Sequence, residues 1–123
     1  MLSLPPSVRI FVCTQPTDMR RSFDGLMALA ETAVGEDPLS GHLFLFRNRR
    51  GDRVKILYWD TDGLVIWYKR LERGTFQWPI DRAPPKSADG RARLEIRADE
   101  LVLLLGGIDL TSVKRRERYR RPA

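Results

Sequence analysis

The sequence predicts an α+β domain, in which a mostly antiparallel sheet of about five strands packs against two helices. The main observation is that residues 43–79 contain three β-rich runs separated by short turn sequences. Two more observations support this class: a β-branched apolar run near the N-terminus, and two segments with helical character. At 123 residues the chain has the length of a single domain.

The stretch 43–79 is expected to form a meander of antiparallel hairpins. The β-rich runs cover residues 43–47, 53–60 and 64–71, and a shorter fourth run covers residues 75–78. The sequences between them, RGD, TDG and ERG, are rich in turn-forming residues. The pair Asp62-Gly63 predicts a tight two-residue turn with Gly63 at positive φ, because glycine adopts that conformation without steric cost.

Both faces of this meander are predicted to be apolar. With two-residue turns at residues 62–63 and 50–51, Trp59 lies opposite Ile66 and Leu45 lies opposite Ile56. Side chains alternate between the faces of a strand, so each face can be read from the sequence. The first face carries Leu43, Leu45, Val54, Ile56, Tyr58, Val65, Trp67 and Leu71. The second carries Phe44, Phe46, Lys55, Leu57, Trp59, Leu64, Ile66, Tyr68 and Arg70. We expect the first face to be core and the second to be covered by a helix or by a partner, with partial helix cover favoured.

The flanking segments supply the other elements. Residues 8–13 are expected to form a strand, whose place in the sheet is left open, and residues 19–33 a helix. Thr17 or Asp18 is the expected N-terminal cap of this helix, and Gly35 its C-terminal cap. Residues 79–93 are expected to form a loop, 94–97 a short strand and 98–105 a second helix. The predicted domain covers residues 1–112, and residues 113–123 form a basic tail.

The charge of the chain favours an anionic partner. There are 22 Lys and Arg residues against 16 Asp and Glu, which gives a formal net charge of +6 and a pI of about 10.1. A protein with this balance is attracted to polyanions, and nucleic acid is the first to consider. An ordinary basic protein has a similar composition, so charge alone leaves both interpretations open.

Compartment and cofactor expectations follow from what the sequence lacks. The single cysteine, Cys13, cannot form an internal disulfide, which favours a reducing compartment and therefore the cytoplasm. No apolar run approaches the roughly 20 residues that span a bilayer, and the N-terminus has no secretory leader. No phosphate-binding glycine motif is present, and we expect no cofactor.

Carboxylates are the remaining candidates for metal chemistry. A structural zinc site needs about four ligands. The sequence has one His (His42) and one Cys (Cys13), so it cannot supply such a site. A cluster of carboxylates can hold Mg²⁺ for phosphoryl transfer. The residues available for such a cluster are Asp24, Asp52, Asp60 and Asp62. Their spacing favours the simpler interpretation, in which aspartates accept backbone N–H bonds in turns.

Two basic clusters are the candidate nucleic-acid-binding residues. The first surrounds the first hairpin turn and consists of Arg47, Arg49, Arg50, Arg53 and Lys55. The second lies in the tail and consists of Lys114, Arg115, Arg116, Arg118, Arg120 and Arg121. Arginine suits phosphate because its planar fork binds two oxygens at once. A solvated loop and a solubilising tail are the alternative interpretation of these clusters.

Three segments resemble a known family. They are TDMRRSFDGL (residues 17–26), LFLFRNRRGDRVKILYWDTDGLVIWYKRLERGTFQWP (residues 43–79) and ELVLLLGGID (residues 100–109). Together they resemble, in family order, the small accessory proteins called TnpB that are encoded by the second reading frame of insertion sequences of the sixty-six family. Arg97 and Gly106 depart from the family pattern at the last helix. The RNA-guided nucleases also called TnpB are several times longer and share none of these segments.

The resemblance implies a role in transposition and DNA recombination, beside a larger transposase that carries the catalytic carboxylates. It supplies no catalytic residue set. The leading hypothesis is a non-catalytic accessory protein that binds DNA at the ends of the element, the transposase or other products of the same element. The first alternative is a small metal-dependent nuclease or strand-transfer factor that uses the four aspartates. The second alternative is a protein-interaction module without nucleic-acid contact.

Overall fold

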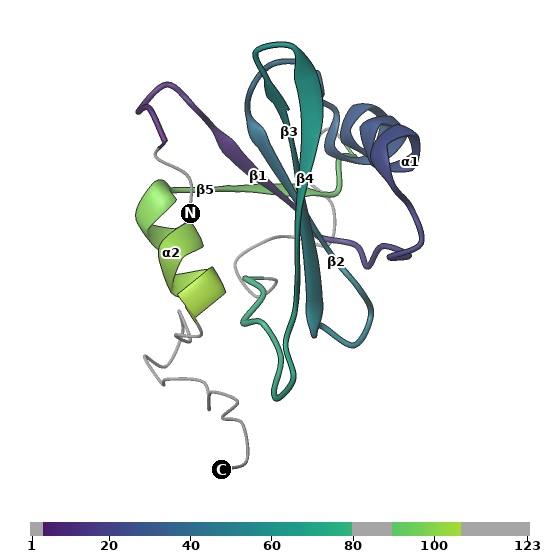
Figure 1. Ribbon diagram of the computed structural model, residues 1–123, viewed down its shortest axis with the longest axis vertical. Coiled ribbons are helices and arrows are strands. Elements are labelled where there is room, and N and C mark those ends of the chain that lie inside the picture. The colour runs from purple at the N-terminus through teal and green to yellow at the C-terminus, as the bar shows by residue number, and fades with distance from the viewer. Residues whose placement is uncertain (1–3, 80–89, 107–123) are drawn as a thin grey trace.

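The computed structural model describes residues 4–79 and 90–106 of the chain. Its elements follow the order β1 (Ile10–Cys13), α1 (Phe23–Leu29), the π-helical segment η1 (Ala30–Val34), β2 (Leu43–Arg47), β3 (Arg53–Asp60), β4 (Gly63–Arg70), β5 (Arg93–Ile96) and α2 (Ala98–Gly106). Figure 1 shows the sheet between α1 and α2, which lie on its opposite sides. Within the described ranges, no helix has the length and apolar character needed to cross a membrane.

The predicted α+β fold with a mostly antiparallel sheet is confirmed. The five strands are ordered β4-β3-β2-β1-β5, and β1 pairs with β2 in parallel while the other pairs are antiparallel. The strand near the N-terminus therefore joins the meander at β2, a placement that the sequence left open. A parallel pair needs a long crossover connection, and here α1 and η1 supply it.

The β3–β4 turn differs from the sequence prediction. Asp60 pairs with Gly63 and Trp59 pairs with Leu64, so the two turn residues are Thr61 and Asp62. Thr61 has a φ of 52° and Gly63 lies within the strand without a positive φ, so the predicted turn at residues 62–63 is wrong by one position. The resulting shift of the register is two residues, which leaves every side chain on its predicted face. The predicted β2–β3 register is confirmed.

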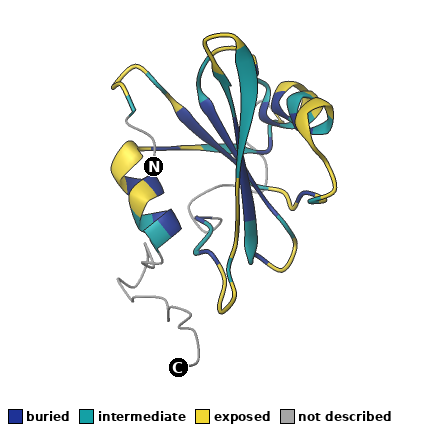
Figure 2. Cartoon of the chain, in the orientation of Figure 1, coloured by how far each residue is buried: buried dark blue, intermediate teal, exposed yellow. Residues whose placement is uncertain are grey.

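Two hydrophobic cores lie on the two faces of the sheet, as the alternation predicted. The first face packs under α2, and the buried residues of this core are Ile10, Val12, Leu43, Leu45, Val54, Ile56, Phe76, Ile96, Leu101, Leu104 and Leu105. The second face packs under α1 and η1, and its buried members are Phe11, Cys13, Leu26, Ala30, Val34, Phe44, Phe46 and Leu57. Partial helix cover of the second face is therefore confirmed, because Tyr68 at its β4 edge stays 46% exposed. Figure 2 shows the buried residues concentrated on the strands between the helices.

The first helix is shorter than predicted. It begins at Phe23 with Ser22 as its N-cap, and neither Thr17 nor Asp18 caps it. Residues 17–21 form a loop, because the backbone N–H of Thr17 donates to the carbonyl of Arg47 on β2 instead of entering the helix. At the other end the predicted cap is confirmed, since Gly35 adopts a left-handed conformation with a φ of 80°.

The elements after the meander agree with the predictions in part. The run 75–78 forms no strand, because the N–H of Phe76 bonds the carbonyl of Gly51 in a turn and not a neighbouring strand. The short strand and the second helix are present as β5 and α2. Glu100 stabilises the start of α2, since its carboxylate accepts the N–H of Arg97 at 3.0 Å. The predicted tail at residues 113–123 lies outside the described residues.

The corrected turn makes a prediction about stability. Thr61→Gly should raise the free energy of unfolding by about 1 kcal/mol, because a non-glycine residue at left-handed φ is strained. Gly63→Val should change it by less than about 0.5 kcal/mol, since no described atom lies within 4 Å of the position that a Cβ would take. Urea unfolding measures both. A large loss of stability in Gly63→Val, with no gain in Thr61→Gly, would place the turn at residues 62–63 after all.

Candidate nucleic-acid interface

Two loops meet at one end of the sheet and form a cleft. One is the β2–β3 turn and the other is the loop between β1 and α1, and both lie at the lower right of Figure 1. The cleft has a volume of about 460 Å³. Its lining residues are Pro16, Thr17, Asp18, Met19, Asn48, Arg49, Arg50, Asp52 and Arg53. The structure thus places three arginines of the first predicted basic cluster around one cleft.

Lys55 fixes the β1–α1 loop against the sheet. Its side chain is buried on the second face, and its Nζ donates to the carbonyls of Met19 and Arg21, both at 2.8 Å. The Nζ also lies 4.7 Å from the ring centroid of Tyr68, a cation–π distance. A buried ammonium needs such partners, because burial without hydrogen bonds is costly. Lys55 therefore holds the loop that frames the cleft.

Asn48 organises the β2–β3 turn. Its Oδ1 accepts the backbone N–H groups of Gly51 and Arg53, both at 3.0 Å, and its Nδ2 donates to Asp52 at 2.6 Å. This last bond is the main cause of the lowered pKa of Asp52. Asn at the first position and Gly at the fourth position of a turn form a known sequence signal, so the role of Asn48 could have been predicted. The turn is thereby fixed with Arg49 and Arg50 exposed at its tip.

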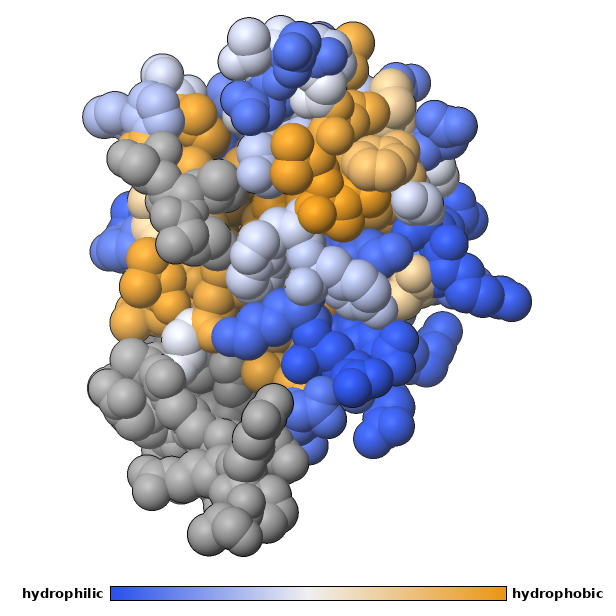
Figure 3. Space-filling model, viewed as in Figure 1, coloured by the Kyte–Doolittle hydropathy of each residue, from blue (hydrophilic) through white to orange (hydrophobic). Residues whose placement is uncertain are grey.

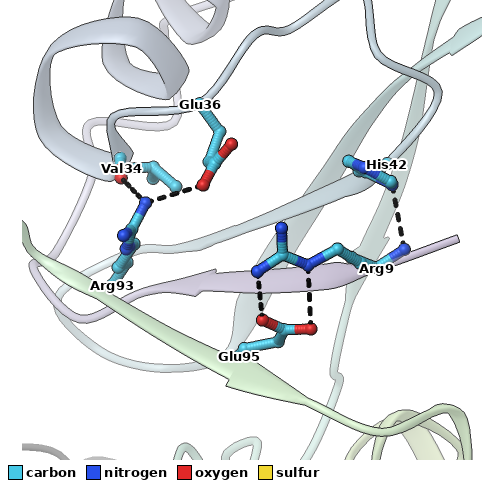
Figure 4. Close-up of polar contacts among 6 residues, drawn as sticks. All are labelled: Arg9, Val34, Glu36, His42, Arg93 and Glu95. Carbon is cyan, nitrogen blue, oxygen red and sulfur yellow. Dashed lines mark hydrogen bonds and ion pairs between the residues drawn. The ribbon is translucent and has the colours of Figure 1, made fainter.

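Five other arginines in the described ranges form ion pairs with carboxylates. On the β1–β5 side, Arg9 makes two bonds to Glu95, and Arg93 donates to both Glu36 and the carbonyl of Val34 (Figure 4). The ion pairs are Arg9–Glu95, Arg20–Asp18, Arg70–Glu72, Arg93–Glu36 and Arg97–Asp99. By contrast, Arg49 and Arg50 make no hydrogen bond or ion pair with any described residue.

The carboxylates of the cleft do not cancel its arginines. Arg20 donates to Asp18 at 2.6 Å, and this hydrogen bond is the main cause that lowers the pKa of Asp18 to about 2. Asp18 is therefore ionised at neutral pH but already paired. Asp52 is the one carboxylate among the lining residues that no arginine binds. Three arginines, Arg49, Arg50 and Arg53, line the same cleft, so its positive charges outnumber this one free negative charge. Figure 3 shows hydrophilic residues gathered over the lower right of the molecule, where Figure 1 places the turn.

The remaining predicted basic residues are not part of this exposed group. Arg47 is only 9% exposed, and its guanidinium lies 5.8 Å from the ring centroid of Trp78. Lys55 is similarly buried, as described above. Both side chains are buried on strands, so neither is exposed at the surface of the cleft. The six basic residues of the tail lie outside the described residues.

The four aspartates of the nuclease alternative are not brought together. Asp52 immediately precedes β3 and Asp60 ends it, so at about 3.3 Å per residue they lie on the order of 25 Å apart. Asp60 and Asp62 are exposed at the β3–β4 turn, and Asp24 lies in the first turn of α1. In residues 4–79 and 90–106, no three His, Cys, Asp or Glu side chains are grouped to hold a metal ion.

The fold and this turn define a small α+β protein with a basic cleft at one end of its sheet. The chain belongs to the family described as IS66 Orf2 like protein, whose model matches residues 8–115. The resemblance of the three sequence segments is thereby confirmed. Membership of this family implies a role in the transposition of an insertion sequence.

Two relatives come from Sinorhizobium fredii (strain NBRC 101917 / NGR234). The chain is 41% identical to protein y4jC over 116 residues, which cover 94% of this chain and 92% of that protein. It is 38% identical to protein y4hO over 109 residues, which cover 89% and 88% of the two chains. No solved structure matches the chain significantly.

The position of Lys55 makes a testable prediction. Lys55→Met should lower the free energy of unfolding by about 1.5–3 kcal/mol, the usual contribution of hydrogen bonds to a charged group. Lys69→Met is the matched control, because Lys69 lies on the adjacent strand β4 and is exposed. Chemical denaturation of both variants measures the difference. Equal stability of the two variants would show that Lys55 does not hold the loop.

Proposed function

We propose that this protein is a non-catalytic accessory protein of transposition that contacts DNA through its β2–β3 turn. The observation that carries the proposal is the pair of exposed arginines, Arg49 and Arg50, which make no hydrogen bond or ion pair with a described residue, although the charge of Arg50 helps to lower the pKa of nearby Asp52. Arg53 lies beside them on the cleft, and among the described residues its guanidinium donates to the hydroxyl of Tyr68 at 3.1 Å. Cations without internal partners are available to phosphate oxygens.

The chemistry of this turn suits phosphate contacts more than base recognition. A guanidinium binds two phosphate oxygens in a planar fork, and a fixed turn presents it with little loss of entropy. Phosphate contacts position a protein on the duplex but carry no sequence information. In this proposal the protein supplies general affinity for DNA, and the choice of the element ends belongs to the transposase. The basic tail at residues 113–123 adds to the same affinity.

The other parts of the proposal follow from the family. The partners are DNA at the element ends, the transposase and other products of the same element, and the compartment is the cytoplasm. A buried cysteine without a disulfide, Cys13, suits that compartment. The protein brings no resident cofactor and leaves strand cleavage to the transposase. The separation of Asp52 from Asp60 disfavours the nuclease alternative. The interaction-module alternative predicts that DNA binding is absent.

The turn arginines should account for part of the salt dependence of DNA binding. Arg49→Gln/Arg50→Gln should weaken binding to duplex DNA and reduce the slope of log affinity against log salt by roughly 0.9 for each phosphate that the variant no longer neutralises. The control is Arg9→Gln/Arg97→Gln, which removes the same charge at residues already paired with Glu95 and Asp99. Fluorescence anisotropy over a salt series measures both slopes. Equal effects in the two double variants would mean that only the net charge of the protein matters. That outcome would contradict the assignment of the β2–β3 turn as the DNA contact.

The tail should contribute separately. Deletion of residues 113–123 removes six cationic side chains, so the salt slope should become flatter while the folded domain melts at the same temperature. The measurement is the same salt series, together with a thermal melt. If the deletion leaves the slope unchanged, the tail does not touch DNA. If full-length protein shows no DNA binding at low salt, the proposed function itself is wrong and the interaction-module alternative takes its place.

A further inference from the structure

Strand β4 forms one edge of the sheet. Its neighbour on one side is β3, and no described strand pairs with its other side. Eight residues form this edge, Gly63–Arg70, whereas the opposite edge strand β5 has four. A long open edge presents a row of unpaired backbone groups to any strand that fits it.

The register shows which backbone groups point outward. The N–H of Leu71 donates to the carbonyl of Asp52 at 2.8 Å, and this pair continues the β3–β4 register. In an antiparallel pair, hydrogen-bonded residues alternate with residues whose backbone groups face away. Counting back in steps of two from Leu71, the residues bonded to β3 are Gly63, Val65, Trp67 and Lys69. The residues whose N–H and C=O point to the open side are Leu64, Ile66, Tyr68 and Arg70.

The edge lacks the features that usually prevent pairing. It contains no proline, and its one-to-one pairing with β3 is uninterrupted over all eight residues, so it has no bulge. Its charged residues, Lys69 and Arg70, lie only at its C-terminal end. Tyr68 is 46% exposed although it is large and aromatic. Natural edges are commonly protected by short length, proline, bulges or inward charges.

We propose that two copies of this chain pair through β4, antiparallel and centred on Ile66. This register aligns the outward backbone groups of one copy with those of the other. It also matches the side chains: Ile66 faces Ile66, Leu64 faces Tyr68 and Val65 faces Trp67, while Asp62 in the turn before β4 approaches Arg70, which Glu72 of its own copy also binds. Apolar residues thus meet apolar residues, and the acidic residue before β4 meets the basic residue at its end. Such cross-strand pairs are the units that stabilise a sheet.

Other alignments of the same edge match less well. A centre at Trp67 also pairs the outward groups, but it places Asp62 opposite Glu72, two like charges. A centre at Val65 places Gly63 opposite Trp67 and leaves the aromatic ring without a side chain to pack on. A parallel alignment in register places Arg70 beside Arg70. The antiparallel alignment centred on Ile66 is also isologous, so it closes as a two-fold dimer and does not extend into a fibre.

The dimer does not depend on DNA binding, but it has a consequence for the proposed function. The β2–β3 turn lies beside Leu71, five residues from the centre of the dimer at Ile66. The two turns are therefore separated by about 33 Å along the strand direction. Arg49 and Arg50 lie beyond Asp52 and to the side of β4, so their separation across the dimer exceeds this value. The dimer would therefore carry two separate basic turns.

Mass and amide exchange of the full chain test the dimer directly. Sedimentation equilibrium over a dilution series should show a reversible monomer–dimer equilibrium up to twice the chain mass of 14.2 kDa. Hydrogen exchange followed by NMR should show that the amides of Leu64, Ile66 and Tyr68 become protected as concentration rises. The amides of Val65 and Trp67, which bond to β3, should be protected at every concentration.

Charge reversal tests the register. Asp62→Arg and Arg70→Asp should each weaken the dimer on the order of tenfold, because two like-charge pairs replace two attractive pairs. The double variant Asp62→Arg/Arg70→Asp should restore the dissociation constant. The control is Arg97→Asp, which makes the same charge change on an exposed residue at the start of α2, away from the edge. It should leave the dimer unchanged.

Each other outcome overturns the proposal. A monomer whose Leu64, Ile66 and Tyr68 amides exchange freely at every concentration means that the edge stays open. A monomer in which they are protected means that a segment of the same chain covers the edge. A dimer whose dissociation constant is unchanged by the charge reversals, and in which these amides still exchange, means that the copies pair through another surface. In all three cases the β2–β3 turn can still bind DNA in a salt-dependent way. The dimer proposal and the proposed function therefore fail independently.

Discussion

Burial of β1 and β2 on both faces is the constraint on which the rest of the structure depends. Every residue of Ile10–Cys13 and Leu43–Arg47 is buried. A strand buried on both sides needs a layer of side chains above and below it, so each face of this sheet needs a helix. Both described helices, α1 and α2, are therefore needed to cover the sheet. Among the described residues, two surfaces that remain open to partners are the loops at the ends of the strands and the edge of β4.

The same constraint explains how a buried lysine can serve an exposed site. Lys55 lies on the face that α1 covers, and its ammonium reaches the carbonyls of Met19 and Arg21 before that helix begins. The loop that frames the cleft is therefore tied to a core strand. Asn48 fixes the facing turn in the same way, through bonds to Gly51, Arg53 and Asp52. Exposed arginines on a fixed turn lose little freedom when they bind an anion.

Local signals in the sequence predicted the meander, both apolar faces and the second helix, because alternation and turn residues act over a few positions. The parallel pairing of β1 with β2 was not predictable in this way, since it joins segments more than 30 residues apart, such as Ile10 and Leu43. The turn was misplaced because Asp62-Gly63 is the stronger local signal, whereas the packing of both faces also accepts Thr61-Asp62. The alternation already placed Lys55 on the covered face, so its burial could have been inferred. That Arg49 and Arg50 pair with no described carboxylate could be seen only once the positions of the described carboxylates were known.

We infer that the end of the sheet formed by the β2–β3 turn and the β1–α1 loop is the surface that contacts DNA. The most direct measurement is an NMR titration of the full chain with a short duplex at low salt. We expect the amide signals of residues 48–53 and 17–20 to shift together and saturate at one affinity, while those of β5 and α2 stay in place. Shifts centred on β5 and α2, with residues 48–53 unchanged, would contradict it.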